Sequence, residues 1–151
     1  MGTGFKGGTI KYHSIGQNVL ITSNSYKYTN GYFGEKSPST GSKTRNIISS
    51  NSVSTATDFY NKIALGGTET VYNNGNMRIT QMSDGSVITW RKISSSDGTP
   101  VVEINISNSS HTGGVKQQKI HFAEEVKGLH MQRIEIEKFV TGAAPIFVRE
   151  K

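Results

Sequence analysis

Apolar residues recur at helical spacing in one segment near the middle of the chain. They stand at i, i+3, i+4, i+7 and i+8, which describes one face of an α-helix: Ala56, Phe59, Tyr60, Ile63 and Ala64. Ser52 or Ser54 is suited to cap the start of this helix by accepting a backbone N–H. Gly66-Gly67 is suited to end it, because glycine adopts the left-handed conformation that often follows a helix. The pattern therefore predicts an amphipathic helix that packs on a sheet.

After this helix, apolar and polar residues alternate with the two-residue period of half-buried strands. The predicted strands are residues 68–72, 77–82, 87–93, 101–107 and 115–122. The clearest turn between them is Asp84-Gly85, because glycine accepts the positive φ of a tight hairpin. The spacing predicts an antiparallel meander of about five strands. Alternation at residues 132–140 and a short apolar run at 145–148 predict further edge strands.

The first 50 residues carry a weaker pattern. Residues 10–12 and 18–22 fit short strands, and the Ser, Pro and Gly of residues 37–42 predict a loop. We expect residues 1–50 to form a basic lead-in whose order the pattern does not define. Residues 51–151 are expected to form the helix-and-sheet core, with one domain overall. The predicted fold class is α+β, with an N-terminal irregular or helical segment packed on an antiparallel, twisted sheet.

The net charge of the chain is positive, which favours polyanions as partners. The 151 residues include 17 Lys and Arg against 11 Asp and Glu, a net charge of +6. The excess is concentrated in residues 1–50, where Glu35 is the only carboxylate side chain. A basic surface attracts polyanions through counterion release, although a soluble protein with a high pI and no such partner shows the same balance.

Other features of the composition exclude several classes of protein. Cysteine is absent, which excludes disulfides, thiolate chemistry and a zinc–thiolate site. No apolar run approaches the roughly 18 residues that a membrane-spanning helix needs. The chain does not open with a basic and then apolar signal peptide. No two histidines stand at metal-ligand spacing with a carboxylate, so we expect neither a metal nor another cofactor.

Alternation also gathers polar side chains on the sheet face opposite the Ile, Val, Trp and Phe positions. With in-register pairing this second face collects eight residues: Arg78, Thr80, Thr89, Arg91, Glu103, Asn105, Lys119 and His121. A solvated sheet face is polar in any protein. This mixture is, however, also what metal-free RNA cleavage requires. That reaction needs a base for the ribose 2′-hydroxyl, an acid for the leaving 5′-oxygen and cations for the phosphorane-like charge.

The catalytic candidates are four of these residues. His121 is the first candidate for the general acid or base, because imidazole titrates near neutral pH. Arg91 is suited to hold the scissile phosphate through its planar guanidinium, or else to form a cross-strand ion pair with Glu103. Glu103 is suited to act as the base or to orient His121 or Arg91. Lys119 would stabilise negative charge, or simply be solvated.

The substrate-binding candidates are Thr89, Asn105, Ser95 and Arg78. Thr89 and Asn105 are suited to hydrogen-bond a phosphate or a base. Ser95 lies in residues 94–99, where hydroxyls and backbone N–H groups offer phosphate contacts, although a polar turn explains this segment more simply.

Aromatic residues interleave with lysines in the first 50 residues: Tyr26, Lys27, Tyr28, Tyr32, Phe33 and Lys36. Such a mixture is able to stack on bases, but packing of the rings on the domain is the favoured interpretation.

Three segments between Ala56 and Phe122 carry a resemblance to a known group. They are "TDFYNKIALGG", "MSDGSVITWRKISSSDGTPVVEINIS" and "QKIHF", and they resemble the toxin modules that end contact-dependent inhibition proteins and related secreted bacterial toxins. The resemblance covers about half of the chain. It implies the barnase/EndoU/colicin/RelE fold, in which the concave face of an antiparallel sheet cuts RNA. It further implies a metal-independent ribonuclease that cleaves tRNA and leaves a cyclic phosphate.

The same resemblance implies partners and a route of delivery. Such modules travel with a cognate immunity protein, often acidic, that blocks the active face, and some require elongation factor Tu of the target cell. They are delivered as part of a larger secreted or cell-surface protein and act in the cytoplasm of a target bacterium.

The residue types of two branches of the group are present here. Barnase-like enzymes use a strand Glu, Arg and a late His, matched in type by Glu103, Arg91 and His121, although Arg91 precedes Glu103 here. EndoU-like enzymes use two His and a Lys, for which His121, His13 and Lys119 are present.

Other function classes remain open from the sequence. One is a non-catalytic RNA-binding module that uses the same basic face. Another is a protein-binding β-rich module, such as a carbohydrate-binding or adhesin domain. A DNase toxin is a third, but such enzymes usually need metal-binding His and Asp clusters that the sequence lacks.

Overall fold

The computed structural model describes residues 14–38, 41–95 and 97–125. The predicted strands at 10–12, 132–140 and 145–148 lie outside these residues. In chain order the elements are α1 (Ile15–Ser23), β1 (Tyr28–Thr29), β2 (Tyr32–Phe33), β3 (Thr44–Ser49), α2 (Ser52–Ile63), β4 (Thr68–Tyr72), η2 (Asn73–Gly75), β5 (Met77–Gln81), β6 (Val87–Arg91), β7 (Val101–Asn105), η3 (Ser109–Thr112) and β8 (Gln117–Glu124).

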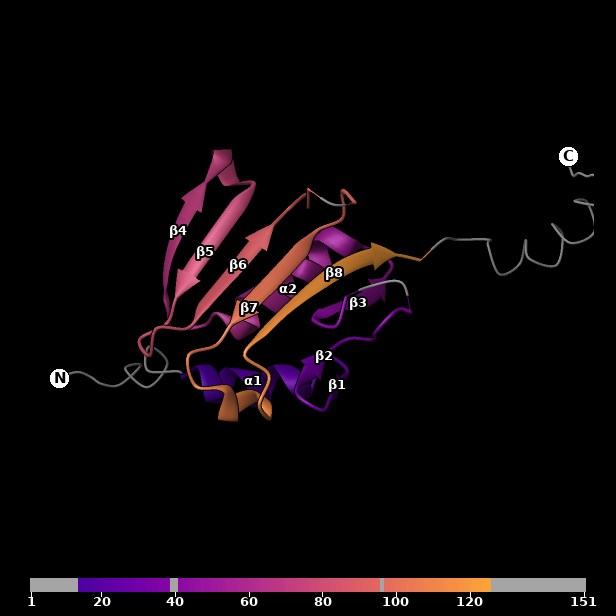
Figure 1. The fold of residues 1–151 in the computed structure, drawn as a ribbon. Helices are drawn as coiled ribbons and strands as arrows, with labels where there is room; N and C mark the ends of the chain where they lie inside the picture. The colour runs from indigo at the N-terminus through magenta and orange to yellow at the C-terminus, as the bar shows by residue number, and fades with distance from the viewer. Residues whose placement is uncertain (1–13, 39–40, 96, 126–151) are drawn as a thin grey trace, which may run out of the picture.

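A six-stranded sheet in the order β3-β8-β7-β6-β5-β4 forms the main layer, and a two-stranded sheet joins β1 to β2. Helix α2 packs on one face of the large sheet, and α1 lies at one end of it (Figure 1). The predicted α+β class is confirmed. The predicted meander corresponds to β4–β8, whose neighbouring strands all pair antiparallel.

Strand β3 adds to the sheet a part of the chain that was expected to be a lead-in. It pairs with β8 in parallel, from Thr44 opposite Lys119 to Ser49 opposite Glu124, so the sheet is mixed. Its sequence, Thr-Arg-Asn-Ile-Ile-Ser, does not alternate between apolar and polar residues, and five of its six residues are partly buried. A pattern built on alternation therefore has no means of detecting it.

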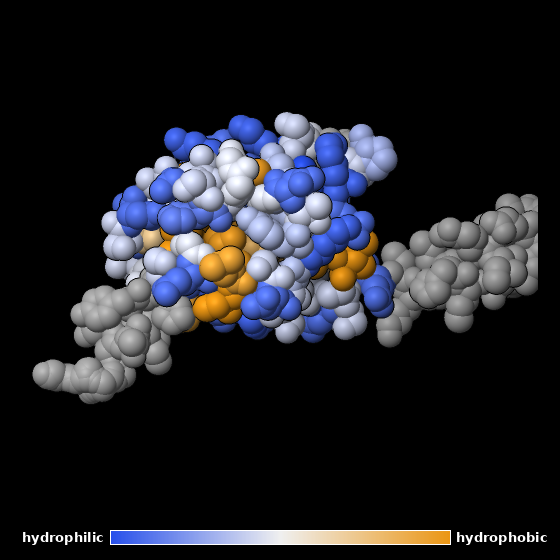
Figure 2. All heavy atoms as spheres, turned by 90° about the horizontal axis from the view of Figure 1, so that it is seen from below, coloured by the Kyte–Doolittle hydropathy of each residue, from blue (hydrophilic) through white to orange (hydrophobic). Residues whose placement is uncertain are grey.

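Helix α1 corrects a second prediction, since residues 18–22 were expected to form a strand. Ser14 caps the helix: its Oγ accepts from the Gln17 N–H at 3.1 Å, and its own N–H donates to Gln17 Oε1 at 3.3 Å. Ile15 and Val19, four residues apart, are both buried. The run Val-Leu-Ile has strand propensity, but the capping box and this buried pair outweigh it. The outer side of α1 carries an apolar patch in which Leu20 and Ile21 are exposed (Figure 2).

Helix α2 matches its predicted stripe, because all five stripe residues are buried. The N-cap is Asn51, whose side-chain oxygen accepts from the Ser54 N–H at 3.0 Å, and not Ser52 or Ser54. Ser52 is instead held by Glu124 at the end of β8. Gly66 follows the helix with φ +91°, as expected of a residue that reverses the chain there.

The core lies between α2 and the sheet and is closed at one end by α1. The sheet contributes Ile88, Trp90, Val102, Ile104, Ile120 and Phe122. The N-terminal part contributes Ile15, Val19 and Phe33 to the same cluster. Phe33 contacts Phe59 of α2 edge-on, with ring centroids 5.1 Å apart. The described part of residues 1–50 therefore belongs to the core of the domain.

Candidate active site on the open sheet face

Helix α2 covers one face of the large sheet and leaves the other face open (Figure 1). Register places most of the predicted site on the open face. Register places Arg91, Val101, His121 and Asn46 side by side across β6, β7, β8 and β3. The next row holds Thr89, Glu103, Lys119 and Thr44. Six predicted residues thus share this open face: Thr89, Arg91, Glu103, Asn105, Lys119 and His121. The expectation of in-register pairing was correct for these three strands.

Arg78 and Thr80 do not belong to this face, which corrects the prediction for both. Arg78 lies opposite Trp90 and Thr80 opposite Ile88, so both point to the α2 side. Thr80 is 2% exposed and hydrogen-bonds the Tyr60 hydroxyl. The Arg78 guanidinium lies 4.7 Å from the centroid of the Tyr60 ring. Arg78 and Thr80 of β5 therefore face the helix although they are polar, and a pattern of polarity alone assigns them to the wrong side.

His121 lies at the centre of a hydrogen-bonded cluster. His121 is 7% exposed. Its Nδ1 atom lies 2.9 Å from Thr99 Oγ1 and 3.3 Å from Asp97 Oδ1. The same Asp97 oxygen accepts from the hydroxyls of Ser94 and Thr99, both at 2.7 Å, and from the Thr99 N–H at 3.0 Å. Among the described residues, none forms a hydrogen bond with His121 Nε2. The cluster therefore anchors one ring nitrogen and leaves the other available.

The charge of Asp97 decides which ring nitrogen carries the proton. Burial alone would raise the pKa of Asp97, but hydrogen bonds from Ser94 and Thr99, together with the nearby His121, lower it to about 2. At neutral pH the group is thus a carboxylate and only accepts hydrogen bonds. The single Thr99 hydroxyl proton points to Asp97, so the Thr99 oxygen accepts from Nδ1–H. In neutral His121 the lone pair is consequently on Nε2, the position of a general base.

Sequence reasoning missed Asp97 and Thr99 and selected Ser95 instead. Ser95 is exposed, whereas Ser94 is buried and bonds Asp97. The segment folds back on itself through Ser94 N–H to Thr99 O at 2.8 Å. One signal was present: Thr99 stands two residues before Val101, and residues two apart on an extended chain share a face. Knowledge that Val101 lies opposite His121 would have placed Thr99 near the imidazole.

Arg91 and Glu103 form an ion pair across β6 and β7. The Arg91 Nη1 to Glu103 Oε2 distance is 3.1 Å, and each side chain is 38% exposed. Arg91 and His121 flank Val101 on either side, so their Cα atoms are about 10 Å apart at the usual strand spacing. Glu103 is the diagonal neighbour of both, at roughly 7–8 Å. The carboxylate, the guanidinium and the imidazole thus surround one small area of the sheet.

Lys119 and Asn105 lie next to this area. Lys119 stands directly opposite Glu103, and Asn105 lies opposite Gln117 at the next position of the same face. Both line a hollow of about 250 Å³ that also includes Lys43 and Thr44. Thr89 stands on the other side of Glu103, on β6. The two lysines of this hollow, Lys43 and Lys119, form a basic rim. The open face therefore combines this basic rim with the His121 cluster.

Two further observations concern the described residues only. They contain no group of three or more His, Cys, Asp or Glu side chains placed to hold a metal ion. None of their helices is long and apolar enough to cross a membrane.

Comparison with known proteins adds no relative to this picture. No protein-family model, curated protein or solved structure matches the chain.

Proposed function

We propose that this domain is an endoribonuclease that cleaves RNA by attack of a ribose 2′-hydroxyl, with His121 as an acid–base residue. The observation that carries the proposal is the anchored imidazole. Asp97 and Thr99 hold Nδ1, and no described residue bonds Nε2.

The reaction needs two proton transfers on either side of one phosphate. A base removes the 2′-hydroxyl proton, the 2′-oxygen bonds to phosphorus, and the bond to the 5′-oxygen breaks as an acid protonates that oxygen. The products are a 2′,3′-cyclic phosphate and a 5′-hydroxyl. His121 Nε2 is suited to one transfer and Glu103, its diagonal neighbour, to the other. The carboxylate of Asp97 stabilises the imidazolium that forms when His121 holds the extra proton.

Cations on the same face supply the electrostatic part of the reaction. Arg91 is suited to bind the non-bridging phosphate oxygens, which carry more charge in the transition state than in the substrate. Its ion pair with Glu103 fixes the guanidinium at the edge of the site before RNA arrives. Lys119 adds a second positive charge on the far side of Glu103.

The biological setting of the proposal comes from the resemblance. The domain would be the C-terminal toxic module of a larger secreted or cell-surface protein and would act on tRNA in the cytoplasm of a target bacterium. An acidic immunity protein would neutralise it by covering the open face, where Arg91, Lys119 and Lys43 lie. Elongation factor Tu is the host factor to add if purified tRNA alone is not cut.

The test is incubation of the purified protein with total bacterial tRNA in EDTA, with and without elongation factor Tu. Discrete fragments that end in a cyclic phosphate are expected from the wild type and not from His121→Ala. His111→Ala is the matched control, because His111 is exposed in η3 and takes no part in the His121 cluster. Intact tRNA under both conditions, or equal cleavage by His121→Ala, would reject the proposal.

One observation favours a second candidate, a non-catalytic RNA-binding module. Arg91 and Glu103 neutralise each other in this structure, which leaves the basic rim as the main feature open to a ligand. That candidate predicts RNA binding that weakens with salt, no cleavage, and only a small loss of affinity in His121→Ala.

A further inference from the structure

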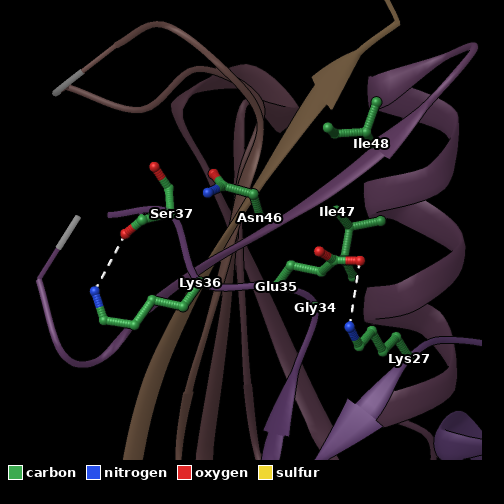
Figure 3. A pocket seen from close by; sticks show the side chains of 8 residues that line it. All are labelled: Lys27, Gly34, Glu35, Lys36, Ser37, Asn46, Ile47 and Ile48. Atoms are coloured by element: carbon green, nitrogen blue, oxygen red, sulfur yellow. Dashed lines mark hydrogen bonds and ion pairs between the residues drawn. The ribbon is translucent and has the colours of Figure 1, made fainter. Parts of the chain in front are cut away.

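Two adjoining hollows lie along the outer edge of β3, next to the open face. One has a volume of about 420 Å³ and reaches Asn46 (Figure 3). The other, of about 520 Å³, reaches Tyr32 and Arg45. Both are lined by Lys27 and by residues 34–36, and together they are called the β3-edge groove. Each has the size of a typical small-ligand site.

The wall of this β3-edge groove is fixed by backbone contacts. Glu35 N–H donates to Asn46 O at 2.9 Å, and Asn46 N–H donates to Glu35 O at 2.8 Å. Gly34 has φ +84°, and a Cβ atom at this position would lie 2.7 Å from Asn46 O. Glycine is therefore required for the segment to approach β3 this closely. The groove exists before any ligand binds.

The charge of the groove suits an anion. Lys27, Lys36 and Arg45 give three positive charges against one negative charge from Glu35, a difference of +2. Lys27 pairs with Glu35 at 3.3 Å, but their side chains are 56% and 71% exposed. An exposed pair of this kind is weak and is easily replaced by a phosphate contact.

Arg45 and Tyr32 provide a flat surface for a base. The guanidinium lies 3.6 Å from the centroid of the Tyr32 ring. Its Nη1 donates to Ser42 O at 2.8 Å and to Thr44 O at 2.9 Å, which fixes the plane. Single-stranded nucleic acids bind proteins by stacking bases on aromatic and guanidinium planes beside cations that contact phosphates.

The other aromatic residues of this region face the core. Tyr26 contacts Phe59 and Tyr28 contacts Phe33, with ring centroids 5.2 Å and 4.6 Å apart. Tyr26 and Tyr28 therefore pack on the domain, as the favoured interpretation of the sequence predicted. Tyr32 instead stacks with the guanidinium of Arg45.

The groove begins one strand away from His121. Asn46, which lines it, is the register partner of His121 in the parallel β3–β8 pair. The Cα atoms are therefore about 4.8 Å apart. We infer that the β3-edge groove binds single-stranded RNA, with Arg45 on Tyr32 stacking a base and Lys36 and Lys27 contacting phosphates. This inference does not rest on the proposed ribonuclease activity.

The experiment measures binding of a short, fluorescein-labelled single-stranded RNA to the full chain. The probe carries 2′-O-methyl groups so that it cannot be cut by 2′-hydroxyl attack, and anisotropy is recorded over a series of KCl concentrations. Lys36→Ala should weaken binding and reduce the slope of log K against log salt by about 0.7, the value for one phosphate contact on a single strand. Glu35→Gln should have the opposite effect and tighten binding, because it removes the negative charge next to Lys36.

Arg45→Lys separates stacking from charge. It keeps the positive charge and removes the plane, so we expect a loss of roughly tenfold in affinity with an unchanged salt slope. Lys62→Ala is the control for loss of a lysine, because Lys62 lies on α2 and pairs there with Asp58. All variants change half-exposed or exposed side chains, and circular dichroism verifies that each is folded.

The outcomes separate this inference from the proposed function. Probe binding with the predicted responses, together with intact tRNA, would reject catalysis and keep the groove. The opposite result is also possible: tRNA is cut, Lys36→Ala has the wild-type salt slope and Arg45→Lys has the wild-type affinity. That result would support the proposed ribonuclease activity and overturn the inference that the groove binds RNA. Failure of the wild type to bind the probe overturns it as well.

Discussion

Asp97 Oδ1 lies 3.3 Å from His121 Nδ1, and the Thr99 hydroxyl bonds both groups. This relationship predicts that Asp97→Asn lowers the catalytic rate, because an amide carries no charge to stabilise the imidazolium. We expect kcat for tRNA cleavage to fall by about 10²-fold or more, the range for one acid–base group. KM should change little, since Asp97 does not line the basic rim.

The comparison needs a control of the same chemistry. Asp84→Asn, in the turn between β5 and β6, removes a carboxylate that bonds only the nearby Ser86 N–H among the described residues. It should leave kcat unchanged. If kcat and kcat/KM fell equally in Asp97→Asn and in Asp84→Asn, Asp97 would serve the fold and not His121.

Asp97 also predicts how stability depends on pH. Its pKa is lowered from 3.8 to about 2 in the folded protein, because hydrogen bonds and the nearby His121 outweigh the opposing effect of burial. A carboxyl group of this kind contributes stability that is complete above its ordinary pKa and is lost as the pH falls through the folded value. The wild type should therefore lose more unfolding free energy between pH 4 and pH 2 than Asp97→Asn. Urea unfolding at several pH values measures this difference, and parallel curves for the two proteins would contradict it.

The sequence predicted the open face better than it predicted the cluster on it. Arg91, Glu103 and His121 were assigned to one face because alternation and in-register pairing are local rules that β6–β8 obey. Asp97 was not found, because its place depends on how residues 94–99 fold back over the end of the sheet. No period or spacing in the sequence encodes that contact.

The Arg91–Glu103 pair has two interpretations that different measurements separate. If Arg91 binds the scissile phosphate, Arg91→Ala should reduce the cleavage rate by roughly 10²-fold, as for other groups that stabilise transition-state charge. The free energy of unfolding should fall by less than about 1 kcal/mol, because a half-exposed ion pair contributes little. A change in stability without a change in rate would assign the pair to the fold alone. Glu103→Gln then tests the carboxylate, since it removes the charge and keeps the shape.

Arg78→Ala tests the corrected assignment of β5. Arg78 donates to Glu69 Oε2 at 2.8 Å and lies over the Tyr60 ring on the α2 side. We expect its loss to reduce the unfolding free energy by about 1 kcal/mol, the sum of a cation–π contact and a partly exposed ion pair. Cleavage of tRNA should be unchanged once the variant is folded. A loss of RNA affinity at unchanged stability would show that this side of the sheet also binds substrate.

Two elements of the N-terminal part show where sequence rules for the fold end. The strand propensity of residues 18–22 is overruled by the Ser14 cap and by burial of Ile15 and Val19 against the rest of the domain. Strand β3 is defined by its parallel partner β8, about 75 residues later in the chain. Both depend on contacts with distant residues, which local propensity does not report. The central helix and the meander are defined by local periodicity and were predicted closely.

Asn18 provides the sharpest test that residues 14–50 are part of one cooperative unit. It is fully buried, and its Nδ2 donates to Ile63 O at 2.9 Å and to Leu65 O at 2.8 Å. These carbonyls belong to the end of α2, where the helix itself supplies no donors. Asn18→Ala leaves both unpaired, so we expect the unfolding free energy to fall by about 2–3 kcal/mol. Asn24→Ala is the control. Asn24 is exposed and directly follows α1, the helix that carries Asn18, so its loss should have a far smaller effect.

Trp90 reports whether this loss reaches the whole domain. Trp90 is on β6 and is buried in the core, whereas Asn18 is on α1 at one end of it. In a single cooperative unit, the urea transitions of Asn18→Ala measured by Trp90 fluorescence and by far-ultraviolet circular dichroism coincide and shift together to lower urea. A lead-in that folds separately gives a different result: the fluorescence transition stays at its wild-type midpoint while part of the helical signal is lost earlier. Because Asn18 bonds Ile63 of the α2 stripe and Leu65 just after it, we expect the first result.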